Sequence, residues 1–128
     1  MQAKMLVRIV MLAAMIVAAT SVQATEQATR TANDVLLQHE MGDEFAKQQA
    51  LAMVNNFEDG LRWAEIMHEK AGHPRFYCPP NNLAMSADQA MDILKWHVRD
   101  QPRYGTVAWQ MALIMGLQAT FPCKSGKP

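Results

Sequence analysis

The sequence lacks the features that mark most enzymes, nucleic-acid-binding proteins and integral membrane proteins. Twelve Lys and Arg residues balance twelve Asp and Glu residues, so no electrostatic footprint for nucleic acid or for an anionic membrane surface is present. There is no glycine-rich phosphate loop and no Gly-x-Ser-x-Gly nucleophile motif. The consecutive acids Glu58 and Asp59 cannot converge on one substrate atom, because adjacent helical residues do not face each other. We therefore predict neither catalysis nor a bound metal or cofactor.

The longest apolar run is too short to span a bilayer, and it lies near the N-terminus. Eleven consecutive apolar residues follow Lys4 and Arg8, whereas a transmembrane helix needs about 20. Val22 and Ala24 then supply the small residues of a cleavage site, which completes the order of a secretory signal peptide. The alternative is a retained membrane anchor, which is disfavoured because nothing after Ala24 extends the run. We predict that residues 1–24 direct export to the periplasm and are removed.

Cysteine is scarce, and its only two copies lie in the part predicted to be exported. Cys78 and Cys123 would meet an oxidising compartment, where two thiols indicate one disulfide. The bridge would close a loop of about 46 residues, which contributes ~4 kcal/mol in the chain-entropy model. The alternative, a nucleophilic cysteine with a histidine partner, would leave the other cysteine without a role.

No segment of useful length alternates apolar and polar residues, so the sequence predicts an all-α fold. Periodicity and capping residues predict a small bundle of about four helices. Their starts are Asn33 or Asp34, Asp43, Ser86 with Gln89 as a capping box, and Thr106, and their ends are Gly42, Gly72, Pro102 and Pro122. The predicted organisation is a signal peptide (1–24), a flexible lead-in (25–32), a helical domain (33–123) and a polar tail (124–128).

The second predicted helix has one apolar face and one polar face. Gly60 lies inside it, and it either breaks the helix or lets another helix approach closely. The apolar stripe consists of Ala50, Val54, Phe57, Leu61 and Ala64. The solvated face carries Gln48, Asn55, Glu58, Asp59, Arg62, Glu65 and Glu69.

The third and fourth helices have stripes of the same kind. His97 falls on the third stripe, and we expect it to be partly buried and hydrogen-bonded. The third stripe is Ala90, Met91, Leu94, His97 and Val98, and the fourth is Val107, Met111, Ile114 and Leu117, with Leu113 and Phe121 alongside.

A histidine pair in residues 68–73 resembles the zinc motif His-Glu-x-x-His. His68 and His73 are five residues apart, whereas two ligands on one helix face need a spacing of four. Gly72 also ends the helix before the second histidine. We interpret the pair as surface histidines at a helix end and predict no metal site.

The proline-containing segment 73–85 excludes a long helix and forms the main connection. It carries aromatic, arginine and asparagine side chains, types that are enriched at protein contacts. We predict that they contact a partner protein; the alternative is that the aromatic rings dock the loop onto the core, and each ring can differ. The residues are Arg75, Phe76, Tyr77, Asn81 and Asn82.

Several short motifs follow one another between residues 76 and 123. They are Phe-Tyr-Cys-Pro-Pro at 76–80, Ser-Ala-Asp-Gln at 86–89, Trp-His-Val-Arg-Asp-Gln-Pro at 96–102 and Leu-Gln-Ala-Thr-Phe-Pro-Cys at 117–123. In this order they resemble the Rap/Tai family of type VI secretion immunity proteins, with Gly116 where that family has Ala. Residues 33–72 match only loosely, because many members carry a second cysteine pair there and this chain has none.

The resemblance implies a helical periplasmic protein, often a homodimer, that binds and neutralises an effector toxin. In that family the toxin is often a peptidoglycan amidase. The missing cysteine pair leaves the particular partner open. An alternative from another class is a periplasmic acid-stress chaperone, which is also short, helical and held by one disulfide.

Overall fold

The computed structural model describes residues 30–81 and 83–124. The chain divides into two units, and the second unit begins at Thr31 and holds every described helix. The predicted signal peptide and its cleavage site lie outside the described residues.

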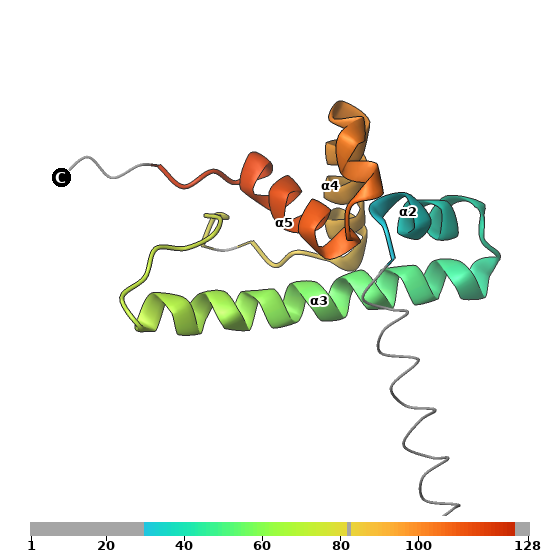
Figure 1. Cartoon of the computed structure of the whole chain (residues 1–128). Helices are drawn as coiled ribbons and strands as arrows, with labels where there is room; N and C mark the ends of the chain where they lie inside the picture. Colours follow the sequence, from blue (N-terminus) through green and yellow to red (C-terminus); the bar gives the residue numbers. More distant parts are fainter. Residues whose placement is uncertain (1–29, 82, 125–128) are drawn as a thin grey trace, which may run out of the picture. The chain divides into compact units, whose positions relative to one another are not determined.

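The described residues form four α-helices and one short 3₁₀ helix (Figure 1). This confirms the all-α prediction, and no described segment is a β-strand beyond an isolated bridge between Thr31 and Ala108. None of the helices described is both long and apolar enough to cross a membrane. The elements are α2 (Ala32–Met41), α3 (Glu44–Lys70), α4 (Ala87–Asp100), η1 (Pro102–Thr106) and α5 (Trp109–Thr120).

Side-chain caps define three of the four helix starts. Thr31 and Asp34 form a capping box at the start of α2, and Ser86 and Gln89 form the predicted one at α4. The Asp43 carboxylate accepts the Ala46 N–H at 2.8 Å at the start of α3, also as predicted. Each cap satisfies a backbone donor that has no partner within its helix.

The fourth start differs from the prediction. Thr106 does not cap a helix; its hydroxyl donates to the carbonyl of Arg103 at 3.2 Å. Residues 102–106 form the 3₁₀ helix η1, and α5 starts later, at Trp109. The buried face also differs from the predicted stripe: Met111 is 54% exposed, whereas Leu113 and Leu117 are buried as expected.

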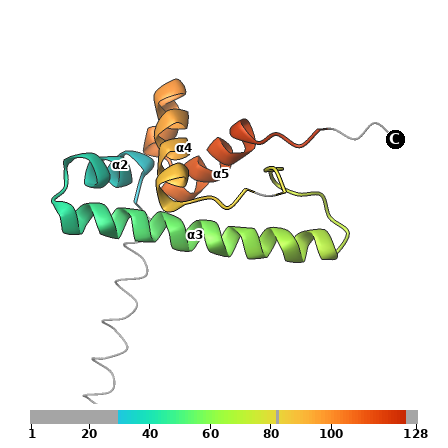
Figure 2. The same ribbon diagram turned by 180° about the vertical axis from the view of Figure 1, so that it is seen from behind.

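The core lies where α2, α4 and α5 pack on one another and on the N-terminal part of α3 (Figures 1 and 2). Trp109, missed in the sequence, is buried and meets the Phe57 ring edge-on at 5.2 Å. Gly116 lets α4 and α5 approach closely, since a Cβ there would lie 3.1 Å from Cγ2 of Ile93. The largest fully buried side chains are Val35, Val54, Met91, Leu94, Leu113 and Leu117.

All five predicted positions of the α4 stripe are buried. The His97 ring stacks on Tyr104 with centroids 4.8 Å apart. Its buried Nε2 has no hydrogen-bond partner within the described part of the chain, so the expected bond is absent at that nitrogen. Burial lowers the pKa of His97, which keeps the ring neutral near pH 7.

The α3 helix runs through Gly60 without a break. A Cβ at Gly60 would meet no atom within 4 Å, so the close approach considered as the other explanation is also wrong. The predicted faces need correction as well: Ala64 is exposed, whereas Glu58 and Glu65 are each only 6% exposed.

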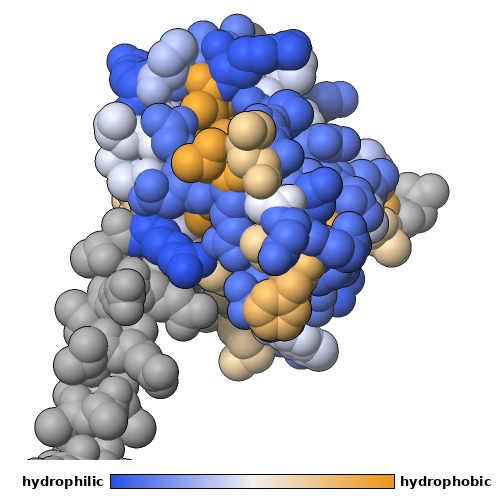
Figure 3. Space-filling model, turned by 90° about the vertical axis from the view of Figure 1, so that its right-hand side faces the viewer, coloured by the Kyte–Doolittle hydropathy of each residue, from blue (hydrophilic) through white to orange (hydrophobic). Residues whose placement is uncertain are grey.

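Large apolar side chains remain exposed where α2 and α3 meet. On the face in Figure 3 they form small separate patches among hydrophilic side chains. Leu37, Met41 and Phe45 are the exposed members near this turn. Scattered exposed apolar residues are normal for a folded chain and carry no functional argument alone.

The predicted disulfide is present between Cys78 and Cys123, whose Cα atoms are 4.9 Å apart. It joins residues 45 positions apart. The adjacent Cys78 N–H donates to the Phe121 carbonyl at 2.8 Å, so a backbone hydrogen bond and the disulfide connect the same two segments.

We expect the double substitution Cys78→Ala/Cys123→Ala to lower the free energy of unfolding by about 2–5 kcal/mol, because the unfolded chain regains its loop freedom. Guanidinium denaturation of the oxidised wild type and the variant measures the loss. Reductant should destabilise the wild type by a similar amount and leave the variant unchanged. Equal stability of both proteins would contradict this role of the bridge.

Candidate protein-binding loop

The described residues of the connection between α3 and α4, 71–81 and 83–86, form no helix or strand, as the prolines in this segment predicted. Gly72 begins it with a positive φ of 82°, a backbone conformation that residues other than glycine rarely adopt. The chain then returns beside the C-terminal half of α3 (Figures 1 and 2). We call residues 73–81 the return loop.

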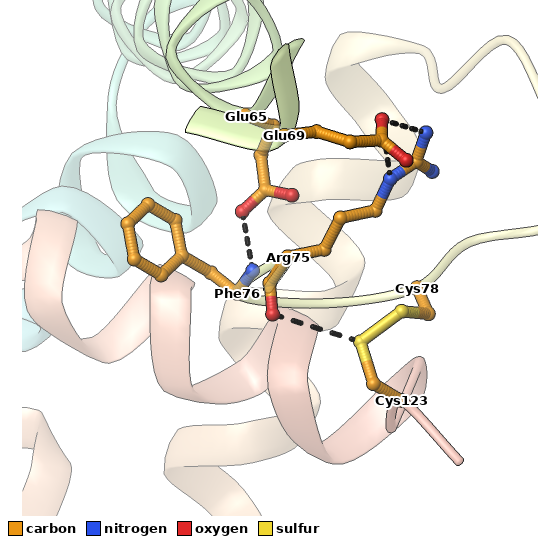
Figure 4. The surroundings of a disulfide bond; sticks show 6 residues. All are labelled: Glu65, Glu69, Arg75, Phe76, Cys78 and Cys123. Carbon is orange, nitrogen blue, oxygen red and sulfur yellow. Dashed lines mark hydrogen bonds and ion pairs between the residues drawn. A yellow bond between two sulfur atoms is a disulfide. The ribbon is translucent and has the colours of Figure 1, made fainter. Parts of the chain in front are cut away.

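Two carboxylates of α3 hold the return loop on one side (Figure 4). Glu65 accepts the backbone N–H of Phe76 at 2.7 Å. One turn later, Glu69 accepts from Nε and Nη2 of Arg75 at 3.0 and 2.6 Å. Glu65 is buried and Glu69 is exposed, so the first bond contributes more to stability than the second.

The disulfide holds the same loop on its other side. Sγ of Cys123 lies 3.8 Å from the Arg75 carbonyl oxygen (Figure 4). This is a packing contact, because a disulfide sulfur has no hydrogen to donate. The backbone at 75–78 is therefore fixed between α3 and the segment that follows α5.

The two aromatic rings of the return loop have different environments. Tyr77 is buried in the core, whereas Phe76 is 44% exposed. The Phe76 ring stacks on His68 with centroids 4.7 Å apart, and His68 stacks on His73 at the same distance. The Tyr77 ring therefore docks the loop onto the core, whereas the Phe76 ring remains accessible to a partner.

The buried Tyr77 lies near two acidic side chains of α3, Glu58 and Glu65. Burial, together with the negative charges of Glu58 and Glu65, raises the pKa of Tyr77 to about 12. Burial also raises the pKa of Glu58. The phenol stays protonated at any physiological pH.

A cleft of about 260 Å³ lies between the return loop and α3. Its walls combine two arginines, an amide and proline rings, a mixture suited to contacting a protein surface. The lining residues are Arg62, Glu65, Ile66, Arg75, Tyr77, Pro79, Pro80, Asn81 and Leu83.

Three of the predicted contact residues, Arg75, Tyr77 and Asn81, line this cleft together. Phe76 lies outside it on the histidine stack, and Asn82 lies outside the described residues. Sequence reasoning missed Arg62 and Glu65. A signal existed for Glu65, because Val54, Glu58, Leu61 and Glu65 continue the stripe spacing of four, three and four residues.

The histidine pair forms a stack of rings at the end of α3. Within residues 30–81 and 83–124, no three His, Cys, Asp or Glu side chains are grouped to hold a metal ion.

We expect Glu65→Ala to lower the free energy of unfolding by about 1–3 kcal/mol, since it leaves the Phe76 N–H without its acceptor. Glu65→Gln retains an acceptor oxygen and should cost less. Glu69→Ala is the matched control: it breaks an exposed ion pair and should cost at most about 1 kcal/mol. Chemical denaturation ranks the three, and equal effects of Glu65→Ala and Glu69→Ala would contradict the assignment.

The pKa of Glu58 predicts a pH-dependent stability. Because its pKa is raised in the fold, the neutral acid is compatible with burial, and stability falls as pH rises through that folded pKa. Glu58→Gln should therefore stabilise the protein more at pH 7 than at pH 4, measured by thermal unfolding. An equal effect of Glu58→Gln at both pH values would refute the prediction.

Comparison of the chain with protein-family models, curated proteins and solved structures finds no significant match.

Proposed function

We propose that this chain is a periplasmic immunity protein, which binds an exported effector toxin and blocks it through the return loop. The observation that carries the proposal is the loop's fixation on both sides, by Glu65 and Glu69 on one and by the disulfide on the other. An inhibitor of this kind needs a surface with a defined shape and no reactive group of its own.

Fixation matters because binding orders the groups that make contact. A loop already held in one conformation loses less conformational entropy when a partner binds, so more of the contact energy appears as affinity. The return loop offers the half-exposed Phe76 ring and the arginines and Asn81 of the cleft. These residue types include those that contribute most to measured protein interfaces.

The resemblance to the Rap/Tai family supports the same proposal. Its two cysteine motifs, Phe-Tyr-Cys-Pro-Pro and Phe-Pro-Cys, are brought together here by the disulfide and by the bond from Cys78 to Phe121. In the proposal, a peptidoglycan amidase is the first toxin to test. A homodimer is a further part of the proposal.

The acid-stress chaperone is less consistent with the described carboxylates. Such a protein must unfold when acid protonates carboxylates that stabilise the fold. Burial raises the pKa of Glu58, so protonation of this group favours the folded state. The pKa of Glu40 is lowered by Lys95, but both partners are exposed, and exposed pairs contribute little to stability.

We expect co-expression in the periplasm to protect cells from the exported toxin encoded beside this gene. The same protein expressed without residues 1–24 should stay in the cytoplasm and give no protection. Colony counts after toxin induction measure the effect. Absence of rescue and of any complex with neighbouring gene products, together with suppression of client aggregation at about pH 2–3, would favour the chaperone instead.

The loop assignment has its own matched test. Asn81 lines the cleft and Asn56 lies on the exposed surface of α3. Asn81→Arg should weaken toxin binding at least about tenfold, equivalent to about 1.4 kcal/mol, whereas Asn56→Arg should leave it unchanged. Calorimetric titration measures both, and a larger effect of Asn56→Arg would place the interface elsewhere.

A further inference from the structure

A second and larger hollow lies between α4 and α5, with a volume of about 390 Å³. Its lining includes no residue of the return-loop cleft. One wall is a face of α4 that carries Asp92, Ile93 and Trp96 and ends at Asp100. We call this hollow the α4–α5 groove.

The groove exists because α5 is lined with small residues where it faces α4. Gly116 and Ala119 form that wall. The Gly116 backbone approaches His97 so closely that a Cβ on the glycine would lie 3.2 Å from the histidine Cβ. The neutral His97 contributes to the lining, and Thr120 uses its hydroxyl internally, donating to the Gly116 carbonyl at 2.8 Å.

The polar groups of the groove are acidic at both ends. Asp92 and Asp100 are separated by eight residues of α4, about 12 Å along the helix axis, and both are exposed. No Lys or Arg lines the groove. Two neighbouring cations are already engaged: Arg103 donates to Gln101 and to the Tyr104 hydroxyl, and Lys95 pairs with Glu40.

Between the two carboxylates stands the indole of Trp96, which is 64% exposed. An exposed tryptophan face attracts a guanidinium through its ring quadrupole. An apolar hollow, an indole and two exposed acids are complementary to an arginine with an apolar neighbour, because the hollow takes the apolar group and the acids attract the cation.

We propose that the α4–α5 groove is a docking site for a protein segment that presents an arginine beside an apolar side chain. The arginine lies over Trp96, near Asp92 or Asp100, and the apolar side chain enters between Ile93 and Ala119. This site does not depend on the proposed immunity function, because it lies on other elements than the return loop.

The probe is a short acetylated and amidated peptide with one arginine between two leucines. Titration into the full-length mature protein, followed by NMR, should shift the Trp96 indole N–H and the amides of Ala119 and Thr120. The exposed Trp63 indole is an internal control and should not move. The same peptide with citrulline, which is isosteric and neutral, should bind more weakly.

Variants separate charge from shape. Asp92→Asn/Asp100→Asn should weaken binding of the arginine peptide by up to about fivefold, the upper end of the range expected for one exposed ion pair, and should leave the citrulline peptide unaffected. Asp59→Asn/Asp88→Asn changes the net charge equally but lies outside the groove, so it should have no effect. Ala119→Leu should fill the hollow and weaken both peptides.

Three results would overturn the proposal. The first is the absence of shifts at Trp96 and Ala119 at millimolar peptide. The second is equal binding of the arginine and citrulline peptides, or an equal loss in both double variants. The third is a dimer, seen by sedimentation, that Asp92→Asn/Asp100→Asn abolishes, because the occupant of the groove would then be a second copy of this chain.

Discussion

The disulfide between Cys78 and Cys123 connects the only long irregular segment of the described chain to the end of α5. The bond from Cys78 N–H to the Phe121 carbonyl reinforces the same junction. The disulfide and this bond fix the position of Cys78 within the return loop. The residues before Cys78 therefore run back beside α3, and Tyr77 enters the core there. The groups available to a partner, Phe76 and the walls of the cleft, are positioned by this constraint.

The returning loop also explains why α3 has an unusual buried face. A helix face that is covered by other helices is normally apolar. Part of this face is covered instead by the return loop, whose backbone N–H groups need hydrogen-bond acceptors. Glu65 satisfies such a donor at Phe76, and Glu58 lies close enough to influence the pKa of Tyr77. Burying a carboxylate costs free energy unless it is paired. The buried Glu65 therefore depends on the loop for its donor, and the loop depends on Glu65 for its position against α3.

Local signals in the sequence predicted much of this fold. The caps at Asp43 and Ser86 and the α4 stripe depend only on residues close in the sequence. The disulfide could be predicted because two cysteines can pair within the chain in only one way. The burial of Glu58 and Glu65 could not be predicted in this way, because periodicity identifies a shared face but not what covers it. The later start of α5 was not predicted either, because residues 102–106 form the 3₁₀ helix η1. Of the candidate site, Arg75, Tyr77 and Asn81 were predicted from residue type, whereas Arg62 and Glu65 come from α3 and required the tertiary fold.

The central claim is that the return loop is rigid because it is held from two sides. Hydrogen exchange of the Phe76 and Cys78 amides tests it most directly, since these donate to Glu65 and to Phe121. In the oxidised protein both amides should be protected nearly as well as those of α4, and reduction of the disulfide should release Cys78 first while α4 stays protected. Rapid exchange of both amides in the oxidised protein would contradict the account.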